Sequence, residues 1–306
     1  MKRVSNTRVV YEFSKNDRPA LTIEPGERVV LDTLDCLGDQ IKTERDTIDS
    51  VDFAKINPAT GPIYVDTALP GDTLMVEIEE MELSKQGIML AVPGLGILGD
   101  QVSVPTTKVV KLVGDKIRFS KDILLPISPM IGVIGIAPAG NPVACGIPGN
   151  HGGNMDTRDI TPRAKVYFPV FVNGALLAMG DVHAVMGDGE ACGTGVEMSA
   201  AITIKIDVIK GSPIRRPLIE TKDSFMTVGS AESLEEAVKM ATGDMVSIMS
   251  NLLKISFEEA YMLLSAAGDV KVSQMVNPFR TARVRVSKEI IPCFCPGRVS
   301  SGTKHD

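Results

Sequence analysis

Two glycine-rich segments hold most of the side chains that could do chemistry. The first reads CGIPGNHGGNMDTRDI over residues 145–160, and the second reads DVHAVMGDGEACGTGVE over residues 181–197. The chain has 3 histidines: His151 and His183 fall in these segments, and His305 is the penultimate residue. Glycine is used where a backbone turns sharply or approaches a ligand closely. Imidazole and acidic groups on such turns therefore favour a functional site over simple packing.

A mixed set of nitrogen and oxygen metal ligands can be assembled from the two segments. Asp181 and His183 are two apart in an expected strand, so their side chains should point to the same face. With Asp156 and Glu190 on loops, the set suits zinc with an open position, or another divalent ion. The spacing does not match a compact zinc pattern such as HExxH. The alternative is that His183 satisfies a buried hydrogen bond and the acids cap turns.

Groups for proton transfer and oxyanion binding also lie in these segments. The backbone N–H groups of Gly152 and Gly153, beside His151, could form an oxyanion-binding nest. A tight turn with a surface histidine would explain the same residues. Glu190 or Glu197 could act as a general base on a water held by a metal.

A cysteine nucleophile is the competing chemistry. Cys145 and Cys192 lie in the two segments, and a histidine is available in principle as the base. Both lie among small residues, as buried structural cysteines do, so packing is the preferred interpretation. Cys293 and Cys295 form a CxC pair without partners, which is weak support for a metal site.

Short strands are expected to position the two segments. Up to residue 130 the pattern predicts strands and turns without helices, and TLMVEIEEM alternates as a half-buried strand does. This half is typical of a β-sandwich or open barrel. Turn signals between apolar runs predict hairpins at Pro25-Gly26, Gly114-Asp115 and Asn173-Gly174. The last hairpin would contain ALLAMGDVHAV as its second strand.

Helical periodicity begins past Gly211. SLEEAVKMATGDMVSIMSNLL and SFEEAYMLLSAAGDV have apolar residues at helical spacing, and each begins with a capping-box pattern. We expect an antiparallel helix pair packed on the sheet, followed by strands in VSQMVNP and ARVRVSKEIIPCF. The predicted fold is mainly β with an α+β portion: a β-sandwich-like core and a C-terminal region containing two packed helices. The expected organisation is a β-rich half over 1–130, a catalytic β region with the helical pair over 131–295 packed with it as one unit, and a disordered tail over 296–306.

Composition excludes several classes of protein. The net charge of −6 and the pI near 5.3 argue against a nucleic-acid partner, and only 4% of the 306 residues are aromatic, which argues against base stacking. Every long apolar stretch contains proline or glycine, so we expect no membrane span. The N-terminus lacks a signal-peptide pattern. The 5 scattered cysteines favour a reducing cytoplasm.

Four longer motifs resemble the acetamidase/formamidase family of amidohydrolases. In chain order they are NPATGPIYVDTALPGDTLMVEI, GNHGGNMDTRDI, GALLAMGDVHAVMGDGEACGTGVE and EAYMLLSAAGDVKVSQMVNP. The resemblance covers almost the whole chain. It implies hydrolysis of the carbon–nitrogen bond of a short linear amide to a carboxylate and ammonia. It also implies a mainly β fold and a site with zinc, sometimes with calcium. Lactam-opening relatives make a γ-lactam-type cyclic amide the alternative substrate.

The resemblance also implies roles for individual residues, including Asp35 in the segment TLDC. The expected catalytic residues are Glu190, His151 and Asp156; the expected oxyanion and substrate-binding residues are Gly152, Gly153 and Asn154; the expected metal ligands are His183, Asp181, Asp156 and Asp35. Which acid is a ligand and which is the base stays open. The rival hypothesis is a non-catalytic β-sandwich that binds a small molecule on a metal-stabilised loop. Apolar surface on the late helices and the β half favours a homodimer.

Overall fold

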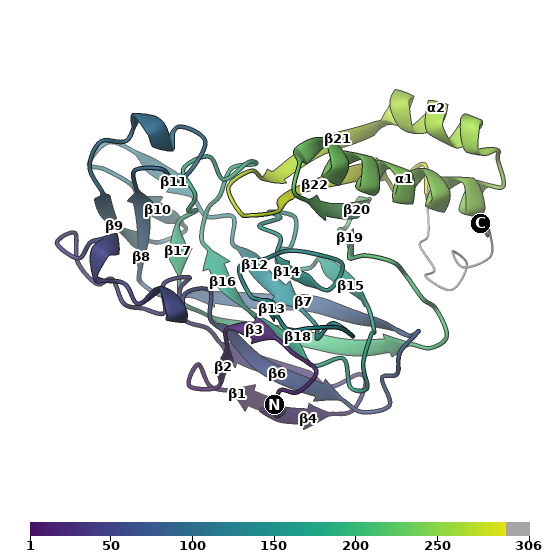
Figure 1. Cartoon of the computed structure of the whole chain (residues 1–306), viewed down its shortest axis with the longest axis horizontal. Helices are drawn as coiled ribbons and strands as arrows, with labels where there is room; N and C mark the ends of the chain where they lie inside the picture. Colours follow the sequence, from purple (N-terminus) through teal and green to yellow (C-terminus); the bar gives the residue numbers. More distant parts are fainter. Residues whose placement is uncertain (292–306) are drawn as a thin grey trace.

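Two large β-sheets form the body of the molecule, which the computed structural model describes over residues 1–291 (Figure 1). The first sheet has nine strands in the order β1 (Lys2–Val4), β5 (Arg28–Asp32), β18 (Ala200–Ile209), β7 (Thr73–Leu83), β15 (Lys165–Pro169), β19 (Leu218–Glu220), β20 (Ser224–Ala231), β22 (Arg280–Ser287) and β21 (Gly268–Gln274).

The second sheet has eleven strands and a branch. Its main path is β11 (Leu124–Pro126), β10 (Lys116–Arg118), β9 (Thr106–Val113), β8 (Gln86–Ala91), β17 (Glu197–Met198), β16 (Leu177–His183), β12 (Met130–Gly135) and β14 (Gly152–Asn154). The branch is β6 (Ala59–Val65), which pairs with β16, β2 (Val9–Val10) and β4 (Leu21–Ile23). A small third sheet joins β3 (Glu12–Phe13) to β13 (Val143–Ala144), and three short 3-10 turns cover Ile48–Ser50, Phe53–Lys55 and Gly99–Gln101.

The main hydrophobic core lies between the two sheets. Alternate residues of a strand share a face, and Ile202, Ile204 and Ile206 of β18 are all buried in this core. Ile131 of β12 and Val182 of β16 enter it from the second sheet. Each such side chain stabilises the fold by roughly 1.5–3 kcal/mol on burial. The predicted mainly β, sandwich-like fold is therefore confirmed.

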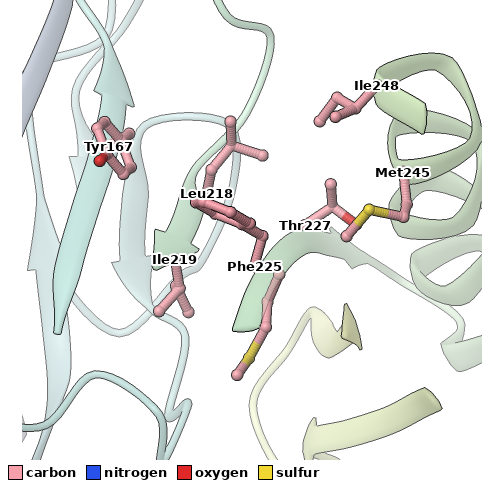
Figure 2. Close-up of a pocket in the computed structure, with 8 residues that line it drawn as sticks. Tyr167, Leu218, Ile219, Phe225, Thr227, Met245 and Ile248 are labelled. Atoms are coloured by element: carbon pink, nitrogen blue, oxygen red, sulfur yellow. The ribbon is translucent and has the colours of Figure 1, made fainter. Parts of the chain in front are cut away.

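Two helices cover the C-terminal end of the first sheet, as predicted. Helix α1 (Leu234–Leu253) packs on β20 and β22 and contacts α2 (Phe257–Ala267) (Figure 1). The side chain of Ser233 caps α1, and Ser256 and Glu259 form a complete capping box on α2. An apolar pocket remains between α1 and the sheet, where Met245 and Ile248 face Leu218 (Figure 2). Its lining is nearly all apolar, so we interpret it as a gap in the packing of α1 against the sheet.

Only one of the three predicted hairpins forms. Strands β9 and β10 pair antiparallel across Gly114-Asp115. The other two predictions are wrong. Strand β4 pairs with β6 while β5 pairs with β18 and β1, and β15 and β16 lie in different sheets. Each of these turns reverses the chain locally, but the strand after it enters the opposite layer of the sandwich.

Strands from both sides of residue 130 share each large sheet. In the first sheet β7 lies between β18 and β15, and in the second β16 pairs with both β12 and β6. The expected tail at 296–306 and the CxC pair lie outside the described residues. Neither helix within residues 1–291 has the length and apolar character that crossing a membrane requires.

Candidate active site

His183 stands at the centre of a buried acidic cluster. It is the last residue of β16, and its Cα pairs with that of Glu197 in β17. Its Nε2 lies 3.1 Å from Asp181 Oδ1 and 3.1 Å from Glu197 Oε2. All three residues are at most 2% exposed. The prediction that Asp181 and His183 share one face of a strand is consistent with this contact.

The first glycine-rich segment brings Asp156 to the same place. Asp156 follows β14, and its Oδ1 lies 3.9 Å from His183 Nε2. Ligand atoms of Asp156, His183 and Glu190 all lie within 4.8 Å of one another. With its amide oxygen facing Asn277 Nδ2, Asn154 donates from Nδ2 to the carboxylates of Asp156 and Asp181 at 3.0 Å. The two segments therefore converge on one cluster.

Two glycines make room for this cluster. A Cβ at Gly132 of β12 would lie 2.4 Å from Asp156 Oδ1 and 2.6 Å from Asp181 Oδ2. A Cβ at Gly195 would lie 2.6 Å from His183 Nδ1. No side chain can occupy either position without displacing the functional groups.

Three of the acids have an unusual backbone conformation. Asp156, Asp181 and Glu190 have φ values of 40°, 54° and 48°. Such left-handed conformations are uncommon outside glycine and tend to occur at functional sites. At Asp181 the conformation interrupts regular pairing with β12, since Val182 and Gly180 pair with Ile131 and Val133 while Gly132 has no partner.

Burial and crowding shift the protonation of the cluster. Burial, then the charge of Asp181, raises the pKa of Asp156 to about 7. Burial raises the pKa of Glu197 to about 8. Burial and then the charge of Asp156 raise the pKa of Glu190 well above its ordinary value. Burial opposes the charged form of His183, but the charges of Glu197 and Asp181 outweigh it and raise its pKa. Asp156 and Glu197 can therefore exchange protons near neutral pH.

The donor set fits a divalent cation. Four buried carboxyl groups surround one imidazole, and an excess of buried negative charge is costly without a cation. Although His183 Nε2 lies 3.1 Å away, its hydrogen bond goes to Asp181 Oδ1, and Glu197 Oε2 makes none within residues 1–291. His183 Nδ1 faces Met186 Sδ at 3.3 Å, which leaves Nε2 directed at the carboxylates. The mixed nitrogen and oxygen ligands are those of zinc and related ions.

His151 does not join the cluster. Its ring packs edge-on against Phe13 with centroids 5.2 Å apart, and Nε2 has no hydrogen-bond partner in the described part of the chain. Burial lowers the pKa of His151 to about 4. The expected catalytic role of His151 therefore has no geometric support.

The glycines after His151 do not form an oxyanion nest. The N–H of Gly152 donates to the carbonyl of Gly149 at 3.1 Å. Gly153 pairs with Ile134 in β12, and a Cβ there would lie 2.3 Å from Ile147 O. Both positions need glycine because two backbones approach closely. Asn154, by contrast, does reach the cluster through its side chain.

Asp35 also lies apart from the cluster, and the next residue, Cys36, lies beside the carboxylates instead. The Oδ1 of Asp35 accepts the N–H groups of Leu37 at 3.0 Å and Asp39 at 2.7 Å, which closes a turn. Among the described residues it belongs to neither group of converging ligand atoms. Cys36 does: its Sγ lies within 4.8 Å of Asp181 and Glu197. Burial and then the charge of Glu197 raise the pKa of the Cys36 thiol well above its ordinary value.

The remaining cysteines of the two segments occupy packing positions. Cys145 is 1% exposed, and burial raises the pKa of its thiol. Cys192 Sγ donates to the carbonyl of Thr194 at 3.4 Å. Neither lies in the cluster.

Sequence reasoning missed three contributors to the site. Gly132 and Cys36 carry no local signal of their roles. Asn277 donates from Nδ2 to Asp156 Oδ2 at 2.6 Å and to the carbonyl of Asn154 at 3.1 Å. In Figure 1 the turn between β21 and β22 that carries it extends toward β16. Its segment, SQMVNP, belongs to the last family motif and to a predicted late strand, but neither pattern assigns Asn277 a role in the site.

Comparison with known proteins finds relatives of one family. The sequence model described as the Acetamidase/Formamidase family matches residues 13–145 and 140–291. A putative formamidase of Schizosaccharomyces pombe is 30% identical over 253 residues, and a formamidase of Methylophilus methylotrophus is 27% identical over 248. These alignments cover 62% and 61% of this chain, and the same shares of the two relatives. The chain thus spans under two thirds of the length of these relatives.

Solved structures match over nearly the whole chain. The crystal structure of an acetamidase from Bacillus halodurans is 46% identical with a TM-score of 0.94, and the match covers 95% of this chain and 98% of that one. A γ-lactamase from Delftia acidovorans is 23% identical with a TM-score of 0.66, covering 93% of this chain and 90% of that one. The second likeness shows a shared fold alone.

Proposed function

Because the chain belongs to the acetamidase/formamidase family, we propose that it hydrolyses the carbon–nitrogen bond of a short linear amide, of the formamide or acetamide type, to a carboxylate and ammonia. The observation that carries this proposal is the buried convergence of Asp156, Asp181, His183, Glu190 and Glu197. The pKa values of Asp156, His183, Glu190 and Glu197 are raised, and buried groups with perturbed pKa values cluster at catalytic sites.

His183, Asp156 and Asp181 would hold a divalent cation, with Glu197 beside them. We propose zinc, because an imidazole nitrogen with carboxylate oxygens suits that ion; calcium prefers an all-oxygen set of six to eight ligands. A bound cation would supply Lewis-acid polarisation of the amide carbonyl. Asn154 and Asn277 orient the carboxylate of Asp156 through their amide groups.

Glu190 is the proposed proton carrier. Glu190 is 6% exposed, and a carboxylate oxygen of it lies within 4.8 Å of ligand atoms of Asp156 and His183. Its raised pKa suits a group that takes a proton from the attacking water and then delivers it to the leaving nitrogen. Burial excludes bulk water, which strengthens each charge interaction in the site.

Ammonia release tests the proposal directly. Purified protein is assayed with formamide and acetamide before and after metal removal by a chelator, and after zinc is restored. We expect turnover that is lost with the metal and recovered with zinc. Full turnover in a protein verified as metal-free would exclude the metal role. Survival of chelation with inactivation by alkylation would instead point to a cysteine nucleophile.

The same assay separates the rival functions. Glu190→Gln keeps the size of the side chain but removes its proton transfer, so it should abolish turnover and leave metal content intact. Ring opening of γ-lactams without hydrolysis of linear amides would favour the cyclic substrate. Inactivity toward every amide and lactam, with the metal bound and the fold intact, would favour a binding protein.

We further propose that the protein acts as a cytoplasmic homodimer. Helix α2 exposes Phe257, Tyr261 and Met262 by 55–64%, and the edge strand β21 exposes Val270 by 55%. Apolar side chains gathered in this way are typical of interaction surfaces. Light scattering on the purified protein gives the mass in solution, and a monomer at micromolar concentration would contradict the dimer.

A further inference from the structure

Arg283 is a buried charge outside the proposed catalytic cluster. It lies in β22, and its side chain is 1% exposed. Its Nε donates to Asp159 Oδ2 at 2.5 Å, and its Nη2 donates to Asp188 Oδ1 at 2.7 Å. Its Nη1 donates to the carbonyl of Val272 at 2.8 Å. The guanidinium is therefore shared between two carboxylates and the neighbouring strand.

The two carboxylates belong to the two glycine-rich segments. Asp159 lies three residues after Asp156, and Asp188 lies two residues before Glu190. Arg283 thus joins the loop that carries a proposed metal ligand to the loop that carries the proposed proton carrier. It is in turn held by a strand pair from the far end of the chain.

Strand β21 and the residue that follows it make further hydrogen bonds to the same two loops. The N–H of Gly189 donates to the carbonyl of Ser273 at 2.9 Å, and the N–H of Met275 donates to the carbonyl of Gly189 at 3.2 Å. Thr157 Oγ1 donates to Ser273 Oγ at 2.9 Å. These bonds hold Gly189 and Thr157, which are the immediate neighbours of Glu190 and Asp156.

From this geometry we infer that Arg283 is a positioning residue that sets the distance between Glu190 and Asp156. A buried ion pair is often no more stabilising than apolar residues of similar size, so stability alone does not account for it. The planar fork of arginine can bond two carboxylates in fixed directions, whereas lysine is a point charge on a flexible stem. The role deepens the proposed amide hydrolysis and rests on it.

The first test replaces Arg283 with lysine and uses a neighbour as the matched control. Arg285 lies on the same strand and pairs with the surface carboxylates of Asp223 and Asp269. For Arg283→Lys we expect kcat for formamide or acetamide to fall about 10- to 100-fold, since small displacements of reacting groups cost this much. KM should change less than twofold, and the acid limb of the pH profile should move. Arg285→Lys should retain wild-type kcat within twofold.

The second test removes each of the two ion pairs of Arg283 separately. Asp188→Asn should lower kcat and shift the pH profile while zinc affinity stays within about twofold. Asp159→Asn should weaken zinc binding about 10-fold, as loss of ligand support does. A purely structural role predicts instead that both variants lose stability alike, with an unchanged kcat and pH profile for the folded fraction. That outcome would overturn the inference.

A readout that does not use turnover separates this inference from the proposed function. Hydrogen exchange of the 187–193 amides should accelerate at least tenfold in Arg283→Lys, while the amides of β18 keep their rates. Unchanged exchange at 187–193 would contradict the positioning role. If the wild type releases no ammonia but this exchange pattern appears, the proposed function is wrong, while the inference that Arg283 holds the 187–193 loop in place is supported.

Discussion

At the scale of single residues, the protonation of the buried acids is the main feature of the site. Four buried carboxyl groups lie around one imidazole, and His183 Nε2 bonds Asp181 Oδ1, so that Glu197 Oε2 makes no hydrogen bond in the described part of the chain. Burial, and after it the charge of Asp181, raises the pKa values of Asp156 and Glu197, so without a cation these acids take up protons. A divalent cation would relieve the repulsion among the carboxylates and leave the acids ionised.

Replacing His183 with alanine should abolish turnover and metal content together. The variant removes the nitrogen ligand that faces the carboxylates at 3.1 Å. His151→Gln is the matched control, because His151 is also buried but packs against Phe13 and belongs to neither group of converging ligand atoms. Metal analysis and ammonia release should show a loss of at least about a hundredfold for His183→Ala. We expect less than threefold for the control, and equal losses would contradict the site.

Stability of the metal-free protein should fall as pH rises from 6 to 8.5. The folded pKa of Glu197 is about 8, above its ordinary value of 4.5, so the folded state keeps a proton that the unfolded chain releases. A raised acid pKa stabilises the fold at low pH, and this contribution is lost as pH rises through the folded pKa. Calorimetry should show a fall in Tm of at least about 3 °C.

The control for this pH effect is Glu197→Gln, which mimics the protonated acid. Its Tm should depend less on pH over the same range. Zinc binding to the wild type should release protons and tighten with pH. A Tm that rises from pH 6 to 8.5 in metal-free protein would show that the buried acids do not hold these protons.

At the scale of elements, three neighbouring strands build the site. β12 lies between β14 and β16, and its Gly132 is the point where the carboxylates of Asp156 and Asp181 approach the strand. The absence of a side chain at Gly132 therefore matters as much as the presence of the acids. The same strand contributes Ile131 and Ile134 to the core between the sheets, so β12 supports both the packing and the site.

Alanine at Gly132 should damage activity more than stability. The new Cβ would lie 2.4 Å from Asp156 Oδ1, which forces the carboxylates to move. We expect kcat to fall about a hundredfold and the unfolding free energy to fall by about 1–3 kcal/mol. Gly140→Ala is the control, since a Cβ there has no atom within 4 Å. Chemical denaturation and ammonia assays measure both effects, and wild-type kcat in Gly132→Ala would disprove the crowding argument.

At the scale of the whole molecule, the site depends on segments far apart in the chain. Glu197 and His183 meet through β17 and β16, Asp156 follows β14, and Asn277 arrives between β21 and β22. Each large sheet also mixes strands from both sides of residue 130. Neither half can complete its sheets without the other.

The full chain should therefore unfold in one cooperative transition. Tyrosine fluorescence and far-ultraviolet circular dichroism should give the same urea midpoint, as two-state unfolding requires. A fragment of residues 1–130 expressed alone should not form a stable fold, because its strands lack their partners. Two separated transitions, or a cooperatively folding fragment, would show that the halves are independent domains.

Local patterns in the sequence were enough to predict the kinds of elements and the chemistry of the two segments. Strand alternation, the helix caps at Ser233 and Ser256, and the i, i+2 spacing of Asp181 and His183 are short-range properties that a linear pattern carries. The family motifs likewise extend along the chain in order. The acidic and imidazole groups that converge were therefore visible before the fold was known.

Only the tertiary structure decided which residues meet. Two predicted hairpins failed because a turn reverses the chain without selecting the sheet that the next strand joins. His151 and Asp35 matched site motifs, yet burial against Phe13 and a closed turn hold them apart from the cluster. Gly132, Asn277 and Arg283 contribute through long-range packing, which no local spacing encodes. The kinds of side chain available for the site can thus be read from the sequence. Which of them meet depends on how the two sheets pack together.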